Sequence, residues 1–287
     1  MGVFRDMMER DLQIRGFSPC TQQCYLGRMK EFVRYFKRPP DNLTIDDINR
    51  YQLHLARERK VSWGVFNQSV AALRFFYSVT LQKDLDIERI PYQKTGRKLP
   101  LVLSQQEVKS LLETPTNIKH RAILMTAYAG GLRVSEVVNL RVSDIDSQRM
   151  TLRVEQGKGR KDRYVMLSAK LLGVLRQYWK TVRSRHWLFP GQIPERHLTR
   201  SAVERIFYHA RDRAGITKKV SVHCLRHCFA THLLESGVNI RKIQVLLGHK
   251  SLQSTQVYTN IAKDSLDNTP SPLDILPDAG SFSPSKS

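Results

Sequence analysis

Two arginines, two histidines and one tyrosine stand in three separate segments of this 287-residue chain. Arg226 lies three residues after His223, Tyr258 lies nine residues after His249, and Arg133 stands in a segment of its own. A guanidinium binds a phosphate with two parallel hydrogen bonds, a phenol becomes a nucleophile once a base takes its proton, and imidazole exchanges protons near neutral pH. These residue types supply most of what is needed to break a phosphodiester without a metal or a nucleotide.

Each of these residues also has an ordinary interpretation when it is taken singly. An arginine is usually a surface charge or an ion-pair partner, and this chain has 47 lysines and arginines. A histidine is usually a partly buried, hydrogen-bonded side chain, and a tyrosine a half-buried packing aromatic. The hypothesis of a chemical site therefore depends on the five residues taken together.

A glycine-rich basic segment covers residues 156–162. Its sequence QGKGRKD contains Lys158 and Lys161 but lacks the GxxxxGK[ST] spacing of a nucleotide-binding phosphate loop. Residues 150–155 and 163–167 on either side alternate in polarity, which predicts two strands joined by a cationic hairpin tip. A mobile ammonium with a lowered pKa is suited to protonating a leaving alkoxide.

Helices must position the other candidate residues. Ser104 and Glu107 have the spacing of a capping box ahead of a helix that carries Val108 to Leu112. Gly130 and Gly131 stop the helix that precedes Arg133. The remaining predicted helices of this part cover residues 122–129, 171–182, 202–214, 223–236, 240–247 and 251–257.

The rest of the chain divides into recognisable parts. Apolar residues at helical spacing, with start signals at Ser18-Pro19 and Thr44, predict a small helical domain over residues 1–90. Residues 91–101 are basic, proline-containing and without apolar period, as in an exposed linker. A second domain then covers residues 102–262, and a tail rich in proline and serine covers residues 263–287.

The net charge of the chain indicates what kind of molecule it binds. The net charge is +21, and the last 24 residues contribute −3, so the chain ahead of them carries +24. A polyanion is the expected partner if this charge gathers on one face. No apolar run approaches the roughly 20 residues needed to cross a bilayer, and the first residues do not read as a signal peptide. We therefore expect a cytoplasmic protein without a membrane partner or a disulfide framework.

The chain resembles the tyrosine recombinases, a family that includes phage integrases, Xer resolvases and integron integrases. Three blocks carry the resemblance, in the order and at the distances usual in the family. They are AGGLRVSEVVNL at residues 129–140, VHCLRHCFATHLLESG at 222–237 and LLGHKSLQSTQVYTN at 246–260. The resemblance implies a mainly α fold with a small antiparallel β-sheet in the C-terminal domain. It also implies a C-shaped clamp made of a helical, SAM-like core-binding domain and a catalytic domain.

The resemblance also implies a role for each candidate residue. Tyr258 would be the nucleophile that forms a 3′-phosphotyrosine, with His223 as its base and His249 as a hydrogen-bond donor to the phosphate. Lys158 matches the lysine of the β2–β3 turn, the general acid to the 5′-hydroxyl, with Lys161 as its competitor. No metal, nucleotide or other cofactor is implied. The implied catalytic set is Arg133, Lys158, His223, Arg226, His249 and Tyr258, and Glu136 supports the two arginines.

The implied partners are duplex DNA and further copies of the chain, as a dimer on each site and a tetramer in synapsis. The tail, through residues 261–276, would pack on a neighbouring protomer. A catalytically silent DNA-binding protein and a monomeric type IB topoisomerase are the alternatives.

The sequence departs from the family at Cys224 and Cys228, which with His223 and His227 suggest zinc, although C-x3-C on one helix is not an established zinc arrangement. The helical insertion of integron integrases is absent, which disfavours single-stranded hairpin substrates.

Overall fold

The computed structural model describes residues 2–83, 89–94, 99–155, 162–249 and 251–259. The chain forms two compact units, Met1–Arg97 and Lys98–Ser287. The tip of the predicted hairpin, with Lys158 and Lys161, lies outside the described residues, and so does the tail from residue 260.

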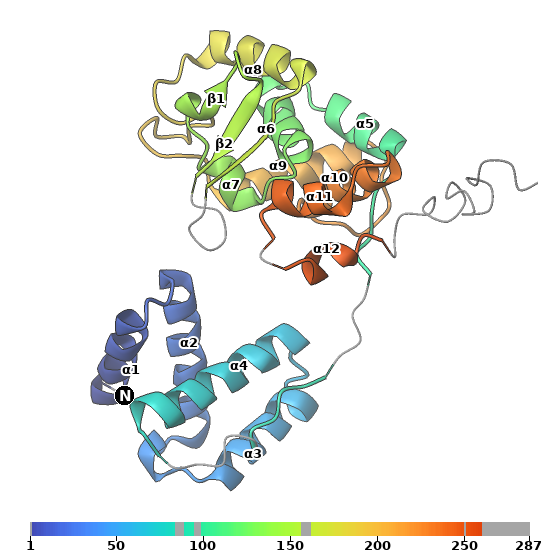
Figure 1. Cartoon of the computed structure of the whole chain (residues 1–287). Helices are drawn as coiled ribbons and strands as arrows, with labels where there is room; N and C mark the ends of the chain where they lie inside the picture. Colours follow the sequence, from blue (N-terminus) through green and yellow to red (C-terminus); the bar gives the residue numbers. More distant parts are fainter. Residues whose placement is uncertain (1, 84–88, 95–98, 156–161, 250, 260–287) are drawn as a thin grey trace, which may run out of the picture. The chain divides into compact units, whose positions relative to one another are not determined.

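The first unit is helical, as predicted (Figure 1). Its α-helices are α1 (Gly2–Ile14), α2 (Pro19–Phe36), α3 (Ile45–Leu53) and α4 (Trp63–Phe75), with a 3-10 turn at Pro40–Asn42 and π turns at His54–Glu58 and Phe76–Thr80. Both predicted start signals are confirmed. The Ser18 hydroxyl accepts from the backbone N–H of Thr21, and Thr44 forms a reciprocal capping box with Asp47.

Aromatic rings fill the core of this unit. Phe32 packs edge-on against Tyr51 and Tyr77, with ring centroids 5.1 and 6.3 Å away. The beginning of the predicted linker also packs here, because the carbonyl of Pro91 accepts from Gln52 Nε2 at 3.0 Å and the carbonyl of Gln93 accepts from Trp63 Nε1 at 2.8 Å. The chain therefore stays on the first unit through residue 93, further than an exposed linker from residue 91 would.

A three-stranded antiparallel sheet and surrounding helices make up the second unit (Figure 1). The strands are β1 (Ile145–Asp146), β2 (Thr151–Val154) and β3 (Arg163–Met166), in the order β1-β2-β3. Leu152 pairs with Val165 and Val154 with Arg163, so the predicted hairpin is confirmed on both sides of its tip. The strand β1 was not predicted.

The helices of the second unit follow the predicted pattern. They are α5 (Gln105–Glu113), α6 (Ile118–Ala129), α7 (Val134–Val138), α8 (Ala169–Val182), α9 (Arg200–Arg213), α10 (Cys224–Glu235), α11 (Ile240–Leu247) and α12 (Gln253–Gln256). The capping box of Ser104 and Glu107 is present at α5, and α7 is the helix that sequence patterns missed. One core of buried side chains joins the inward face of the sheet to α6, α8, α9 and α10. The chain is thus mainly helical with a small antiparallel sheet, as expected.

No helix in the described ranges combines the length and the apolarity that a bilayer crossing requires.

Candidate active site

Arg133 occupies the N-cap position of α7, directly after the break that ends α6. The break depends on Gly131, which has φ +56° and lies so close to the ring of Phe229 that a Cβ would overlap it. Arg133 donates its backbone N–H to Glu136 Oε2 at 2.8 Å and its Nη1 to Oε1 at 2.7 Å. Its side chain keeps 21 % of its surface exposed, so Arg133 is only partly withdrawn from solvent.

Arg226 lies in the first turn of α10 and is 1 % exposed. Its Nη1 donates to the carbonyl of Gly131 at 2.6 Å and its Nη2 donates to the carbonyl of Leu247 at 2.5 Å. Burial, and then the neighbouring Arg133, lower the pKa of Arg226 to about 10, which still leaves it charged at neutral pH. Arg226 therefore fastens the end of α6 to the end of α11.

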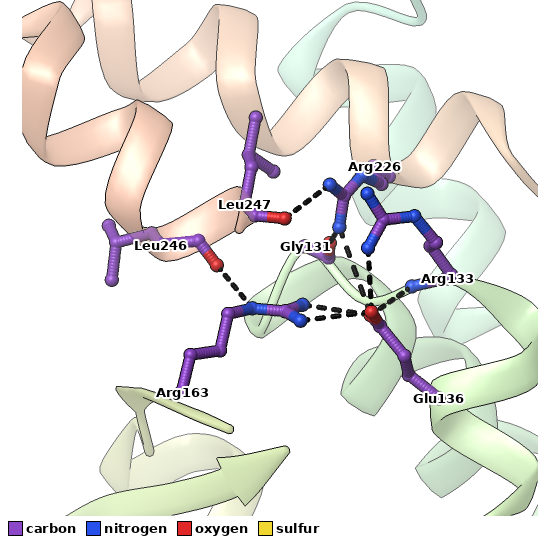
Figure 2. A network of polar contacts seen from close by, with 7 residues as sticks. All are labelled: Gly131, Arg133, Glu136, Arg163, Arg226, Leu246 and Leu247. Carbon is purple, nitrogen blue, oxygen red and sulfur yellow. Dashed lines mark hydrogen bonds and ion pairs between the residues drawn. The ribbon is translucent and has the colours of Figure 1, made fainter. Parts of the chain in front are cut away.

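Glu136 is the acceptor common to the arginines of the site (Figure 2). Besides the hydrogen bonds from Arg133, its carboxylate accepts hydrogen bonds from both terminal nitrogens of Arg163. Nη1 of Arg226 lies 3.8 Å from its Oε2. Burial alone would raise its pKa, but the hydrogen bonds and charges of Arg163 and Arg133 lower it to about 2. The expected support of the two arginines by Glu136 is thus present, with Arg163 as an additional partner that the sequence reasoning missed.

Tyr258 lies almost entirely beneath the surface, at 2 % exposure, in a cluster with Phe229, Ile243 and Leu247. Its hydroxyl is 3.1 Å from Nδ1 of His227. Burial raises the pKa of Tyr258, and the charges of Arg226 and Arg133 partly offset that rise. The phenol therefore lies within electrostatic reach of both arginines.

Two histidines one helical turn apart stand at the start of α10. His223 precedes the helix and is exposed, whereas His227 is half-buried, and their rings meet edge to face at 4.8 Å. Partial enclosure and the charges of Arg226 and Arg133 lower the pKa of His223. Burial, with His223 next, lowers the pKa of His227 to about 4. In this conformation the structure places His227, and not His223, in contact with the Tyr258 hydroxyl.

His249 follows Gly248, which ends α11 with φ +63°. Its Nδ1 is 2.8 Å from the hydroxyl of Thr255, a fully buried residue of α12. The hydrogen bond ties His249 to the short helix that leads into Tyr258. The structure thus draws five of the predicted residues into one region, while Lys158 lies outside the described residues.

Cys224 and Cys228 face each other on α10 with their sulfurs 3.6 Å apart. Cys224 Sγ donates to the carbonyl of Leu101, and Cys228 Sγ accepts from the N–H of Leu103. Among the described residues, no group of three or more His, Cys, Asp or Glu side chains could hold a metal ion. The cysteines therefore pack the segment ahead of α5 onto α10.

Comparison with known proteins shows the family to which the chain belongs. A family model described as the phage integrase family matches residues 102–265, and one described as the phage integrase N-terminal SAM-like domain matches residues 4–87. The chain is 49% identical to the integrase/recombinase-type protein y4qK of Sinorhizobium fredii, over 96% of this chain and 90% of that protein. It is 36% identical to tyrosine recombinase XerA of Thermococcus onnurineus, over 90% of each chain.

Solved structures show the same relationship. A crystal structure of XerA recombinase is 31% identical, with a TM-score of 0.54 over 92% of this chain and 95% of that chain. XerH bound to its difH substrate in a post-cleavage complex shares the fold, with a TM-score of 0.73 at 22% identity over 88% of this chain and 80% of that chain. The chain belongs to the phage integrase family and is a tyrosine-type site-specific DNA recombinase.

Proposed function

We propose that the chain cleaves and rejoins duplex DNA through Tyr258. The phenolic oxygen attacks the phosphorus, the bond to the 5′ oxygen breaks, and a 3′-phosphotyrosine and a free 5′-hydroxyl result. A 5′-hydroxyl reverses the step by attacking the same phosphorus and releasing the tyrosine. The ester conserves the bond energy, so the cycle uses no ATP. The observation that carries this proposal is that Arg133 and Arg226, both paired with Glu136, lie within electrostatic range of the Tyr258 phenol.

The arginines suit the transition state of this reaction. A five-coordinate phosphorus carries more negative charge on its oxygens than the diester does, so fixed cations stabilise it preferentially. Arg133 retains exposed surface for a phosphate, and Arg226 is charged and fixed by two carbonyls. Because Tyr258 is 2 % exposed, its side chain must leave the cluster around Phe229 before it attacks.

DNA is the proposed partner of both units. XerH in complex with difH and a lambda integrase dimer on a core site share the fold of this chain, with TM-scores of 0.73 and 0.71. The charge of +21 favours a polyanion. We assign DNA binding to residues 1–90, the interdomain linker to residues 91–101 and catalysis to residues 102–262. The chain would act as a dimer on each site and as a tetramer in synapsis. The tail, through residues 261–276, would dock on a neighbouring protomer.

Covalent trapping tests this proposal. A duplex nicked close to the cleavage site loses a short fragment after cleavage, so rejoining fails and the adduct accumulates. We expect a protein–DNA band on a denaturing gel, with the DNA attached through its 3′ end. DNA binding without any such band would identify a catalytically silent DNA-binding protein.

Lys158 is the proposed acid for the 5′-hydroxyl. We expect Lys158→Ala to slow cleavage by on the order of a hundredfold, the usual contribution of general acid catalysis. A 5′-bridging phosphorothiolate should restore most of the rate, because a thiolate leaves without a proton. Lys161→Ala is the matched control and should need no rescue. Rescue confined to Lys161→Ala would assign the role to that lysine.

The two histidines at the start of α10 divide the work on Tyr258 in our proposal. A base is most effective with a pKa near the working pH, and the pKa of His227, about 4, makes it a poor proton acceptor. His223 is exposed to solvent, and its pKa is lowered less than that of His227. We therefore assign the role of general base to His223 and the orientation of the Tyr258 hydroxyl to His227.

The pH profile separates these two roles. A base must be neutral, so wild-type cleavage should hold at pH 7 and fall only at pH values below the ordinary histidine pKa of 6.5, because the pKa of His223 is lowered. His223→Gln should slow cleavage about a hundredfold and remove that acid limb. His227→Gln, which can still hydrogen-bond Tyr258, should keep the limb. Loss of the limb in His227→Gln alone would exchange the two assignments.

A further inference from the structure

Arg163 is a buried arginine at the first position of β3. It lies on the same face of the strand as Val165 and Leu167, which are 1 % and 2 % exposed, and its own side chain is 8 % exposed. An arginine on the inward face of a strand requires acceptors inside the protein. Its charge therefore serves contacts within the fold and is largely withdrawn from solvent.

Three donors of the Arg163 guanidinium are engaged by two other elements. Nη1 and Nη2 donate to the two carboxylate oxygens of Glu136 at 2.9 and 2.8 Å, and Nε donates to the carbonyl of Leu246 at 2.8 Å (Figure 2). The first pair forms a planar fork, the geometry that distinguishes arginine from lysine. Arg163 thus joins β3 to α7 and to the last turn of α11.

Gly248 gives a second, independent sign of this fit. A Cβ at this position would lie 3.1 Å from Cδ and 3.4 Å from Nη1 of Arg163. The backbone that turns from α11 toward His249 therefore rests directly on the Arg163 side chain. The left-handed φ of +63° at Gly248 points to the same tight turn.

These contacts place Arg163 at the centre of the catalytic framework. Through Glu136 it reaches Arg133, which the same carboxylate holds by two hydrogen bonds. Through Leu246 it fixes the turn whose next carbonyl, that of Leu247, accepts from Arg226. The strand that carries Arg163 also leads out of the basic hairpin. Three donors of Arg163 contact Glu136 and the carbonyl of Leu246, so these contacts support the site from within the protein.

We propose that Arg163 is a positioning residue for strand cleavage. It holds Glu136 and the carboxyl end of α11 in register, so that Arg133, Arg226 and His249 meet the same phosphate. The inference rests on the proposed chemistry at Tyr258. It adds a residue that acts through Glu136 and the turn at Gly248 without touching the DNA.

The test compares Arg163→Met and Arg163→Lys with Arg153→Met as the matched control. Arg153 stands on the neighbouring strand β2 and pairs with Asp144, whose side chain is 2 % exposed and which directly precedes β1, so the control also removes an arginine from a buried carboxylate. Three quantities are measured on the full chain: the midpoint of thermal unfolding, the affinity for a half-site duplex, and the rate of adduct formation at saturating protein.

We expect Arg163→Met to slow adduct formation on the order of a hundredfold, as small displacements of catalytic groups do, while half-site affinity stays within a few-fold. Arg163→Lys keeps the charge but lacks the fork, so it should recover only a minor part of the rate. Arg153→Met should stay within a few-fold of wild type in rate. A 5′-bridging phosphorothiolate should not rescue Arg163→Met, because protonation of the leaving group is not the step that this variant impairs.

Several outcomes would overturn the inference. They are an unchanged rate in folded Arg163→Met, an equal loss in Arg153→Met, or rescue by the phosphorothiolate, which would place the effect on the hairpin lysine. If Arg163→Met does not fold, Arg163→Lys carries the same comparison, and wild-type speed in that variant would contradict the role of the fork. Absence of an adduct in the wild-type protein would instead count against the proposed chemistry, which keeps the two failures distinct.

Discussion

Tyr258→Phe is expected to abolish the covalent adduct while DNA binding persists. The change removes only the hydroxyl, and the ring can keep its packing beside Phe229 and Leu247. The lost hydrogen bond to His227 costs about 1 kcal/mol, too little to unfold a domain. Cleavage should fall below detection because no other atom replaces the phenolic oxygen. The measurement is adduct formation on a nicked duplex, read beside a gel shift on an intact one.

Tyr164→Phe is the control for this experiment. Tyr164 stands on β3 and is 62 % exposed, so its hydroxyl can be removed without disturbing the core. Adduct formation in this variant should match that of wild type. An adduct that persists in Tyr258→Phe would move the nucleophile to another side chain and refute the assignment.

Helix boundaries were predictable from the sequence because the interactions that set them are local. In each capping box, Ser104 with Glu107 and Thr44 with Asp47, the two partners are three residues apart. Both partners can therefore be recognised in one short stretch of sequence. The two π turns could not be anticipated in this way. Apolar spacing does not distinguish an α-helix from a π turn: Leu55 and Tyr77 are fully buried, but the backbone reaches them through π turns.

The contacts that complete the site are long-range, and sequence periodicity does not pair distant residues. Arg163 and Glu136 are 27 residues apart, and His227 and Tyr258 are 31 apart. A signal for Arg163 was nevertheless present, because a predicted strand places it on the same side as Val165, where a charge needs a buried partner. Likewise, one helical turn separates His227 from His223, which predicts that both rings reach the same region.

Arg133→Ala is expected to lower the rate of cleavage a hundredfold or more and to change DNA affinity only a few-fold. Its side chain is 21 % exposed and is bound to Glu136 by one nitrogen of the guanidinium, so it can stabilise a phosphate as negative charge develops. Arg149→Ala is the charge-matched control, since that side chain is 86 % exposed and lies in the turn ahead of β2. Rate and affinity are measured separately, by adduct formation and by titration of a half-site duplex.

Arg226 requires a different substitution, because it is both a candidate phosphate ligand and a structural tie. Arg226→Ala would remove the side-chain donor to the carbonyls of Gly131 and Leu247. It would also remove one of the arginines that neutralise Glu136. Breaking a buried charged contact of this kind costs about 3–5 kcal/mol, so lost cleavage in Arg226→Ala would mix unfolding with chemistry. Arg226→Lys keeps the charge and one donor direction, and it should fold while cleaving on the order of a hundredfold more slowly, because an ammonium cannot form the two-point contact. An affinity that falls in step with the rate in both Arg133→Ala and Arg226→Lys would show that the two arginines clamp the ground-state phosphate and do not discriminate the transition state.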